Sequence, residues 1–247
     1  MDLKKYLDST YLKTAVQAGL SEEENRLVVH DAVKEAIEQN FKLIMIRPDM
    51  VAMAKEMISQ AKSNLTIGTV IDFPEGAGSL SDKMAEAMKA IEDGADDLDF
   101  VVNYQAFKAG DTAAVKQQVF ECTRLGLENG KIVKWIIEIA ALNEHQIVQL
   151  CALVKNVVLS NFDESAYERV FVKSSTGFYP TPAGVPNGAT VPAIKLMLEN
   201  SFPLPVKAAG GVRTYEEAVE MISLGVKRIG TSSAAAIAAG GSSSGSY

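Results

Sequence analysis

Short apolar segments alternate with amphipathic segments along the chain, and the alternation occurs eight times. Most of the apolar segments are nearly continuous runs rich in Val and Ile, which is typical of strands buried on both faces of a parallel sheet. The strand candidates are Tyr6–Thr10, Leu43–Ile46, Thr66–Phe73, Asp97–Val102, Ile132–Ile139, Arg169–Ser175, Leu204–Ala209 and Arg228–Ser232.

The segments between these runs have the spacing and the capping residues of helices. Ser21–Glu24 reads as a capping box in front of an apolar stripe, and Thr214–Glu217 reads as a second one before a helix that ends near Gly225. The other helix candidates are Met50–Ser63, Lys83–Asp93, Ala113–Asn129, Asn143–Lys155, Val191–Asn200 and Ala234–Ala239.

Eight strands that alternate with helices predict a single α/β domain, a (β/α)8 TIM barrel over residues 1–239. A doubly wound open sheet is the alternative. That fold usually has fewer strands and a glycine-rich nucleotide loop, and neither GxGxxG nor GxxxxGK[ST] occurs here. Residues 240–247 are Gly and Ser up to a final Tyr247, and we expect them to form a flexible tail.

Composition narrows the class of protein further. The chain has 247 residues, 47% of them hydrophobic, and a formal net charge of −7. A barrel of about 250 residues is commonly one domain. The acidic balance argues against nucleic acid as a partner. The N-terminal segment has no apolar region of the kind found in signal peptides, and no apolar run approaches the roughly 18 residues of a membrane span. We therefore expect a cytoplasmic protein with no membrane partner.

Cysteine and histidine usage indicates no metal centre. Cys122 and Cys151 lack CxxC spacing, so we interpret them as plain thiols in a reducing compartment. His30 and His145 stand alone in separate helical segments. A metal site needs several ligands that converge, and we therefore expect none.

Charged residues stand inside or at the ends of the apolar runs, where a barrel strand should be apolar. Catalytic groups of barrel enzymes come from the carboxyl ends of strands, and lysine is almost never buried without a partner. Side chains that point inward from several strands meet inside the barrel. The strongest candidates are Asp99, Lys134, Lys173 and Lys207, and the weaker ones are Asp8, Asp72 and Glu138.

Strand lysines grouped in this way predict Schiff-base chemistry. A free lysine has a pKa near 10.4 and is not nucleophilic at neutral pH. Desolvation and a neighbouring ammonium both lower that pKa. A neutral lysine beside a charged one can attack a carbonyl carbon, and a nearby carboxylate can shuttle the protons that imine formation requires.

Glycines and hydroxyl groups follow the last three strand candidates. The segments are Ser174–Gly177, Gly210–Thr214 and Gly230–Ser233, and the last two lead directly into helices. Barrel enzymes commonly hold a phosphate in the loops after strands seven and eight, where backbone N–H groups at helix N-termini face the anion. The pattern therefore predicts an anion site.

Taken together, these motifs resemble the deoxyribose-phosphate aldolase family. The resemblance runs from about residue 5 to the end of the chain. The segments that carry it are Leu-Asp-Ser-Thr at 7–10, Gly-Ala-Asp-Asp-Leu-Asp at 94–99, Lys134 with the following Ile-Ile-Glu, Val-Lys-Ser-Ser-Thr-Gly at 172–177, Val-Lys-Ala-Ala-Gly-Gly-Val-Arg-Thr at 206–214 and Gly-Thr-Ser-Ser at 230–233.

The resemblance implies a homodimeric class I aldolase that uses neither metal nor cofactor. Its reaction is the reversible cleavage of 2-deoxy-D-ribose 5-phosphate to acetaldehyde and D-glyceraldehyde 3-phosphate. Lys173 would form the Schiff base, Lys207 would be its charged neighbour, and Asp99 would relay protons with support from Lys134. Tyr247 would assist proton transfer at the enamine carbon. The implied substrate contacts are Asp8, Thr10, Thr176, Gly177, Gly210, Gly211, Gly230, Ser232 and Ser233.

Two departures from the family pattern leave alternatives open. Phe178 stands where many members have a lysine, which removes a cation from the expected phosphate site. A related aldolase that prefers unphosphorylated aldehydes is therefore one alternative. Met45 stands where some members have a cysteine. The alternatives from other classes are a phosphate-binding barrel isomerase that relies on carboxylates and an inactive binding protein that keeps the anion site.

Overall fold

The strands close into a single barrel. The computed structural model describes residues 2–241, and within this range neighbouring strands are parallel all the way round, with β1 paired to both β2 and β8. The predicted (β/α)8 barrel is thus confirmed, and the open-sheet alternative is wrong. The strands are β1 (Leu7–Thr10), β2 (Leu43–Ile46), β3 (Thr66–Ile71), β4 (Asp97–Val101), β5 (Ile132–Ile136), β6 (Val170–Lys173), β7 (Val206–Ala209) and β8 (Arg228–Thr231).

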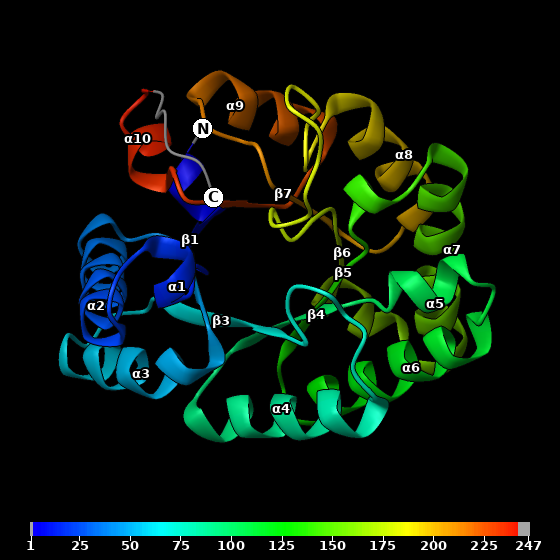
Figure 1. The fold of residues 1–247 in the computed structure, drawn as a ribbon, viewed down its shortest axis with the longest axis horizontal. Helices are drawn as coiled ribbons and strands as arrows, with labels where there is room; N and C mark the ends of the chain where they lie inside the picture. Colours follow the sequence, from blue (N-terminus) through cyan, green and yellow to red (C-terminus); the bar gives the residue numbers. More distant parts are fainter. Residues whose placement is uncertain (1, 242–247) are drawn as a thin grey trace.

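The longer helices form an outer ring around these strands (Figure 1). Short 3-10 helices lie at η1 (Leu3–Lys5), η2 (Pro48–Met50), η3 (Ile139–Ala141) and η4 (Glu164–Arg169). The α-helices are α1 (Ala15–Ala18), α2 (Glu22–Gln39), α3 (Val51–Gln60), α4 (Leu80–Asp93), α5 (Tyr104–Lys108), α6 (Thr112–Glu128), α7 (Glu144–Asn161), α8 (Val191–Ser201), α9 (Tyr215–Leu224) and α10 (Ala234–Ala238). None of those between residues 2 and 241 is both long and apolar enough to cross a membrane.

Local sequence signals account for most of the element boundaries. Both predicted capping boxes are present, with the Ser21 and Thr214 side chains accepting from the backbone N–H groups three residues on. Strands β3 and β5 end earlier than the apolar runs predict, because Asp72 and Glu138 adopt left-handed backbone conformations (φ 54° and 53°). Helix α7 runs to Asn161, six residues past its predicted end.

The alternation of side chains along each strand separates an apolar layer from the barrel interior. On β4, Leu98 and Phe100 join the core between strands and helices, where Phe100 stacks on Trp135 with ring centroids 5.1 Å apart. Asp97 and Asp99 lie on the opposite face of the same strand and are buried. The fold therefore directs these carboxylates into the barrel.

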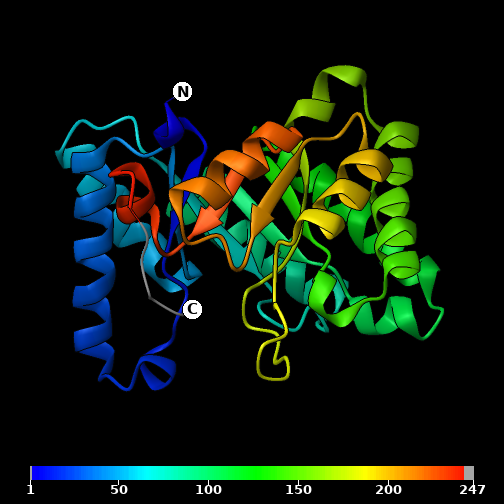
Figure 2. The same ribbon diagram turned by 90° about the horizontal axis from the view of Figure 1, so that it is seen from above.

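The loop between β6 and α8 extends from the end of the barrel where the strands finish (Figure 2). Its far end returns to the barrel at Ala189, whose N–H donates to the carbonyl of Gly210 (2.7 Å). Gly188 lies so close to Gly210 that a Cβ on it would sit 2.2 Å from that carbonyl oxygen. A glycine is required at this crossing, which holds the loop against the end of β7.

Candidate active site

Seven charged side chains meet inside the barrel, and none is more than 5% exposed. Burial at this level is costly for a charge unless it is paired, and each of these groups takes part in an ion pair. The residues come from β1, β4, β5, β6, β7 and β8, and they are Asp8, Asp97, Asp99, Lys134, Lys173, Lys207 and Arg228.

Asp99 is the centre of this cluster. Its Oδ1 accepts from Nζ of Lys134 (2.7 Å), and its Oδ2 accepts from Nζ of both Lys173 (2.9 Å) and Lys207 (3.0 Å). Strand register produces the arrangement, because Asp99 pairs with Lys134 and Lys173 pairs with Lys207 across neighbouring strands. Burial works against the charged carboxylate, but the three lysines outweigh it and hold the pKa of Asp99 well below its ordinary value.

Lys173 and Lys207 lie side by side in different electrostatic surroundings. Burial lowers the pKa of Lys173 to about 8; Asp99 opposes this shift, while the charge of Lys207 adds to it. Burial also disfavours the charge on Lys207, but Asp8 (2.7 Å) and Asp99 outweigh it and raise the Lys207 pKa above its ordinary value. The pair therefore has one lysine that readily becomes a neutral amine and one that stays cationic.

Two members of the cluster, Asp97 and Arg228, were missed by the sequence reasoning. Asp97 accepts from Nζ of Lys134 (2.6 Å), and the guanidinium of Arg228 donates to Oδ1 of Asp8 through Nε (2.8 Å). A signal was available for Asp97, because it lies two residues before Asp99 and so shares its face of the strand. Arg228 lies two residues before Gly230 in the same way.

The remaining polar candidates lie around this cluster. Oγ1 of Thr10 donates to the backbone carbonyl of Asp8 (2.9 Å). Thr176 donates to the buried Glu138 through both its hydroxyl and its backbone N–H. Burial raises the pKa of Glu138, and the hydrogen bonds from Thr176 offset part of that shift. Asp72 does not belong to this site. It lies in the loop after β3 and is ion-paired with the buried Lys83 of α4.

The loops after β6, β7 and β8 are tied to one another. Oγ of Ser174 donates to the carbonyl of Ala209 and accepts from its N–H (2.8 and 2.9 Å). Oγ1 of Thr231 donates to the carbonyl of Val212 (2.7 Å). Three candidate glycines in these loops have left-handed backbones that favour glycine, and they are Gly177 (φ 83°), Gly210 (φ 80°) and Gly211 (φ 90°).

The three candidate residues on β8 and in the loop after it, Gly230, Ser232 and Ser233, differ in burial and in their contacts. A Cβ on Gly230 would lie 3.1 Å from Cε of Lys207, so this glycine makes room for the lysine side chain. Ser232 is exposed, whereas Ser233 is buried and donates its N–H to Oγ1 of Thr231 (3.0 Å). No side-chain cap from Ser233 closes the first turn of α10.

Phe178 lies in apolar surroundings at the end of the barrel. Its ring meets that of Phe73 edge to face, with centroids 5.2 Å apart. Both rings pack against a small interior cluster made of Leu12, Leu43, Met45 and Val70. Many members of the resembled family have a lysine at this position. Here Phe178 makes an aromatic contact between the loops after β3 and β6 instead.

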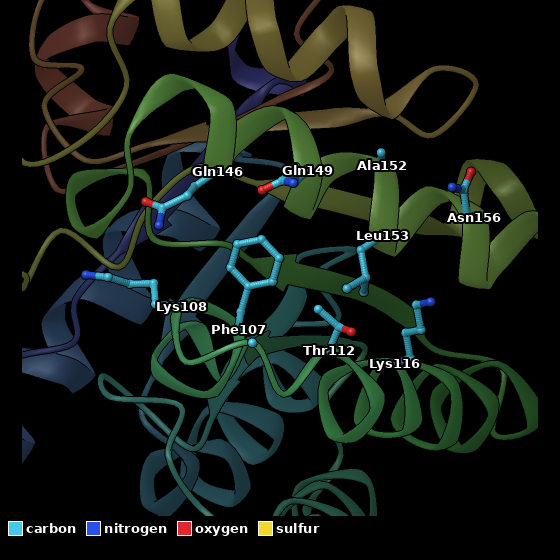
Figure 3. Close-up of a pocket in the computed structure, with 10 residues that line it drawn as sticks. Phe107, Lys108, Thr112, Lys116, Gln146, Gln149, Ala152, Leu153 and Asn156 are labelled. Atoms are coloured by element: carbon cyan, nitrogen blue, oxygen red, sulfur yellow. The ribbon is translucent and has the colours of Figure 1, made fainter.

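Tyr247 is outside the described residues. Residues 2–241 contain no group of three or more His, Cys, Asp or Glu side chains placed to hold a metal ion. A groove of about 520 Å³ runs over the outside of the barrel between α5, α6 and α7, with Phe107, Lys116 and Gln149 among its lining (Figure 3). It includes none of the predicted site residues.

Comparison with known proteins identifies the family. Residues 12–245 match the model described as "DeoC/LacD family aldolase". The chain is 40% identical to a deoxyribose-phosphate aldolase of Thermococcus gammatolerans over 97% of this chain and 96% of the relative. It is 33% identical to that of Streptococcus pneumoniae over the full length of both.

Solved structures agree with this assignment. "QR15, an Aldolase" superposes with a TM-score of 0.80 at 31% identity, covering 97% of this chain and 95% of that one. The tetrameric deoxyribose phosphate aldolase of Aeropyrum pernix superposes with a TM-score of 0.77 at 26% identity, covering 96% and 89%. With a lysine pair on a shared carboxylate and full-length relatives of one kind, this chain is a member of the DeoC/LacD aldolase family.

Proposed function

We propose that this protein is a class I aldolase that reversibly cleaves 2-deoxy-D-ribose 5-phosphate to acetaldehyde and D-glyceraldehyde 3-phosphate. The observation that carries the proposal is the pair formed by Lys173 and Lys207 on one oxygen of Asp99. A buried amine beside a fixed ammonium is the arrangement that makes lysine nucleophilic towards a carbonyl. The full-length relatives with this activity support the choice of substrate.

The proposed reaction begins with neutral Lys173. Its Nζ attacks C1 of the open-chain sugar, and loss of water from the carbinolamine gives a protonated imine. Asp99 carries protons between Lys173 and the leaving hydroxyl, and Lys134 holds the Asp99 carboxylate in place (2.7 Å). Lys207 remains charged, and burial together with this neighbouring charge lowers the Lys173 pKa and so raises the fraction of neutral amine.

Carbon–carbon cleavage follows from the imine. Asp99, the proposed proton carrier, takes the proton of the C3 hydroxyl as the C2–C3 bond breaks. The electron pair of that bond moves into the imine and leaves an enamine on Lys173. The C3–C5 fragment departs as glyceraldehyde 3-phosphate. Protonation at C2 and hydrolysis then release acetaldehyde and regenerate the free amine, and we propose Tyr247 as the group that assists this protonation.

We assign the phosphate to the loops after β6, β7 and β8. Their left-handed glycines favour this assignment, because the backbone nests that bind anions contain left-handed residues. The proposed contacts are Gly177, Gly210, Gly211, Gly230, Ser232 and Ser233. Asp8 belongs to the buried charge cluster, Thr10 donates to its backbone carbonyl, and Thr176 donates to Glu138. We propose that Asp8, Thr10 and Thr176 form the polar network around the sugar hydroxyls.

A second candidate is an aldolase of the same mechanism that prefers unphosphorylated aldehydes. Phe178 favours it, because an aromatic ring packed on Phe73 supplies no charge to a phosphate. The two candidates differ in one ratio, kcat/KM for deoxyribose 5-phosphate over that for deoxyribose. A ratio well above one supports the phosphorylated substrate, and a ratio below one supports the second candidate.

The family resemblance also leads us to propose a homodimer in the cytoplasm. The Aeropyrum pernix relative is described as a tetramer. Light scattering after size exclusion measures the state of this chain directly.

Formation of acetaldehyde from deoxyribose 5-phosphate tests the proposal. The expected result is acetaldehyde release that persists in EDTA, since no step of the proposed reaction uses a metal. No release from either sugar would reject both candidates, and loss of activity in EDTA would reject the Schiff-base mechanism.

A further inference from the structure

Six of the buried charges form a closed ring of alternating sign inside the barrel. Each member contacts two members of opposite charge, at N to O distances from 2.5 to 3.7 Å. In order, the members of this charge ring are Arg228, Asp8, Lys207, Asp99, Lys134 and Asp97.

The charge ring is neutral by itself, because its three cations match its three carboxylates. Lys173 lies outside the ring and is attached to it through Asp99 (2.9 Å). The other charged groups that face Lys173 are the cations Lys134 from β5 and Lys207 from β7, while Glu138, after β5, is bonded to the loop that follows β6. Protonated Lys173 thus adds one uncompensated positive charge to a buried site, which is costly.

We propose that Arg228 and Asp97 are positioning residues that select Lys173 as the lysine that gives up its proton. Within residues 2–241, the hydrogen bond and ion pair of Lys173 are with Asp99 and not with Arg228 or Asp97, and neither of these two residues has a proposed contact with the reacting atoms. They act by closing the charge ring, so that Lys134 and Lys207 each have two carboxylate partners and Lys173 has one. The inference rests on the proposed function in one respect, which is that neutral Lys173 acts as the nucleophile.

The charge count predicts shifts of opposite sign for two substitutions. In Arg228→Gln, three carboxylates face three lysines, so a protonated Lys173 restores neutrality and keeps its proton to higher pH. In Asp97→Asn, the ring already carries an excess positive charge, so Lys173 loses its proton at lower pH. Each midpoint is expected to move by about one pH unit. In Arg228→Lys the charge remains, and the midpoint stays near that of the parent.

The experiment measures how fast Lys173 reacts with acetic anhydride as a function of pH, without any substrate. Mass spectrometry of the Lys173 peptide gives the labelling rate, and the exposed Lys195 in the same digest corrects for hydrolysis of the reagent. Arg26→Gln, which removes an exposed arginine on α2, controls for a change in net charge alone. Circular dichroism selects the folded variants, and if Arg228→Gln does not fold, Asp97→Asn is compared with the parent.

The expected order of midpoints is Asp97→Asn lowest, the parent and Arg26→Gln together, and Arg228→Gln highest. Any other order overturns the proposal, and so does an unshifted midpoint in the Asp97 variant when it is the one that folds. A purely structural role would lower activity without moving the two midpoints in opposite directions. Failure of the proposed function would appear separately, as absence of acetaldehyde release from a parent protein whose Lys173 labels as expected.

Discussion

Lys173 and Lys207 donate to the same oxygen, Oδ2 of Asp99, from neighbouring register positions on β6 and β7. The two ammonium groups are therefore held close enough to repel each other when both are charged. Lys207 is ion-paired with Asp8 as well as with Asp99, whereas the ion pair of Lys173 is with Asp99. This difference in partners supports our proposal that Lys207 stays charged and that Lys173 is the nucleophile.

The pH dependence of activity follows from the Lys173 pKa of about 8, to which burial lowers it. The reactive form is the neutral amine, so activity rises as pH increases through that value. About one tenth of Lys173 is neutral at pH 7 and about nine tenths at pH 9. We expect an acid limb near pH 8 in kcat/KM for deoxyribose, whose lack of phosphate removes a competing titration. A limb above pH 10 would mean that Lys173 is not perturbed.

Replacing Lys207 by Leu should slow turnover by about 100-fold or more, because the fixed positive charge beside the reacting amine is lost. The acid limb should move to higher pH in the residual activity, since Lys207 no longer disfavours the protonated form of Lys173. The buried Asp8 carboxylate is still paired with Arg228 in this variant, so we expect the protein to fold. Thermal unfolding checks this. A folded variant with the parent's rate and profile would remove Lys207 from the mechanism.

How much of this site was visible in the sequence depends on where each charge stands in its strand. Lys134, Lys173 and Lys207 were predictable, because lysine in the middle or at the carboxyl end of an apolar run contradicts burial unless it has partners. Asp97 and Arg228 begin their strands, where charged residues are ordinary. Only the closure of the barrel, which brings β8 next to β1 and across from β4, shows that they pair.

The architecture of the fold was predictable from the sequence, but some strand ends and loop contacts were not. The period of apolar residues defines strands and helices, and the count of eight defines the barrel. The early ends of β3 and β5 were not predictable, because residues other than glycine rarely adopt the left-handed backbone that Asp72 and Glu138 have. The surroundings of Phe178 were also hidden, since its contact with Phe73 joins loops that are far apart in sequence.

Phe178→Lys should favour phosphorylated substrates. A charge-assisted hydrogen bond to phosphate contributes about 1.5–3 kcal/mol, which corresponds to about tenfold or more in KM. The gain should appear with deoxyribose 5-phosphate and not with deoxyribose. Phe178→Leu is the matched control, because it removes the aromatic contact with Phe73 without adding charge. If KM changes equally for both sugars, position 178 does not face the phosphate.

Tyr247→Phe should slow turnover substantially while leaving imine formation at Lys173 intact. The proposed role of the phenol comes after the imine, at protonation of the enamine carbon. Exchange of the acetaldehyde methyl protons with deuterated solvent should slow in parallel with turnover. Deleting residues 241–247 should reproduce both effects. Unchanged rates in the deletion variant would show that the C-terminal segment takes no part in catalysis.

Covalent trapping tests the central claim most directly. The protein is incubated with acetaldehyde and borohydride, digested and examined by mass spectrometry, with Lys173→Arg as the matched control. An imine on Lys173 is reduced to a stable ethylamine, so the predicted result is one ethyl group on the Lys173 peptide and loss of labelling at this site in the variant. An unlabelled Lys173, with the ethyl group on Lys207 or Lys134 instead, would contradict the assignment of the nucleophile.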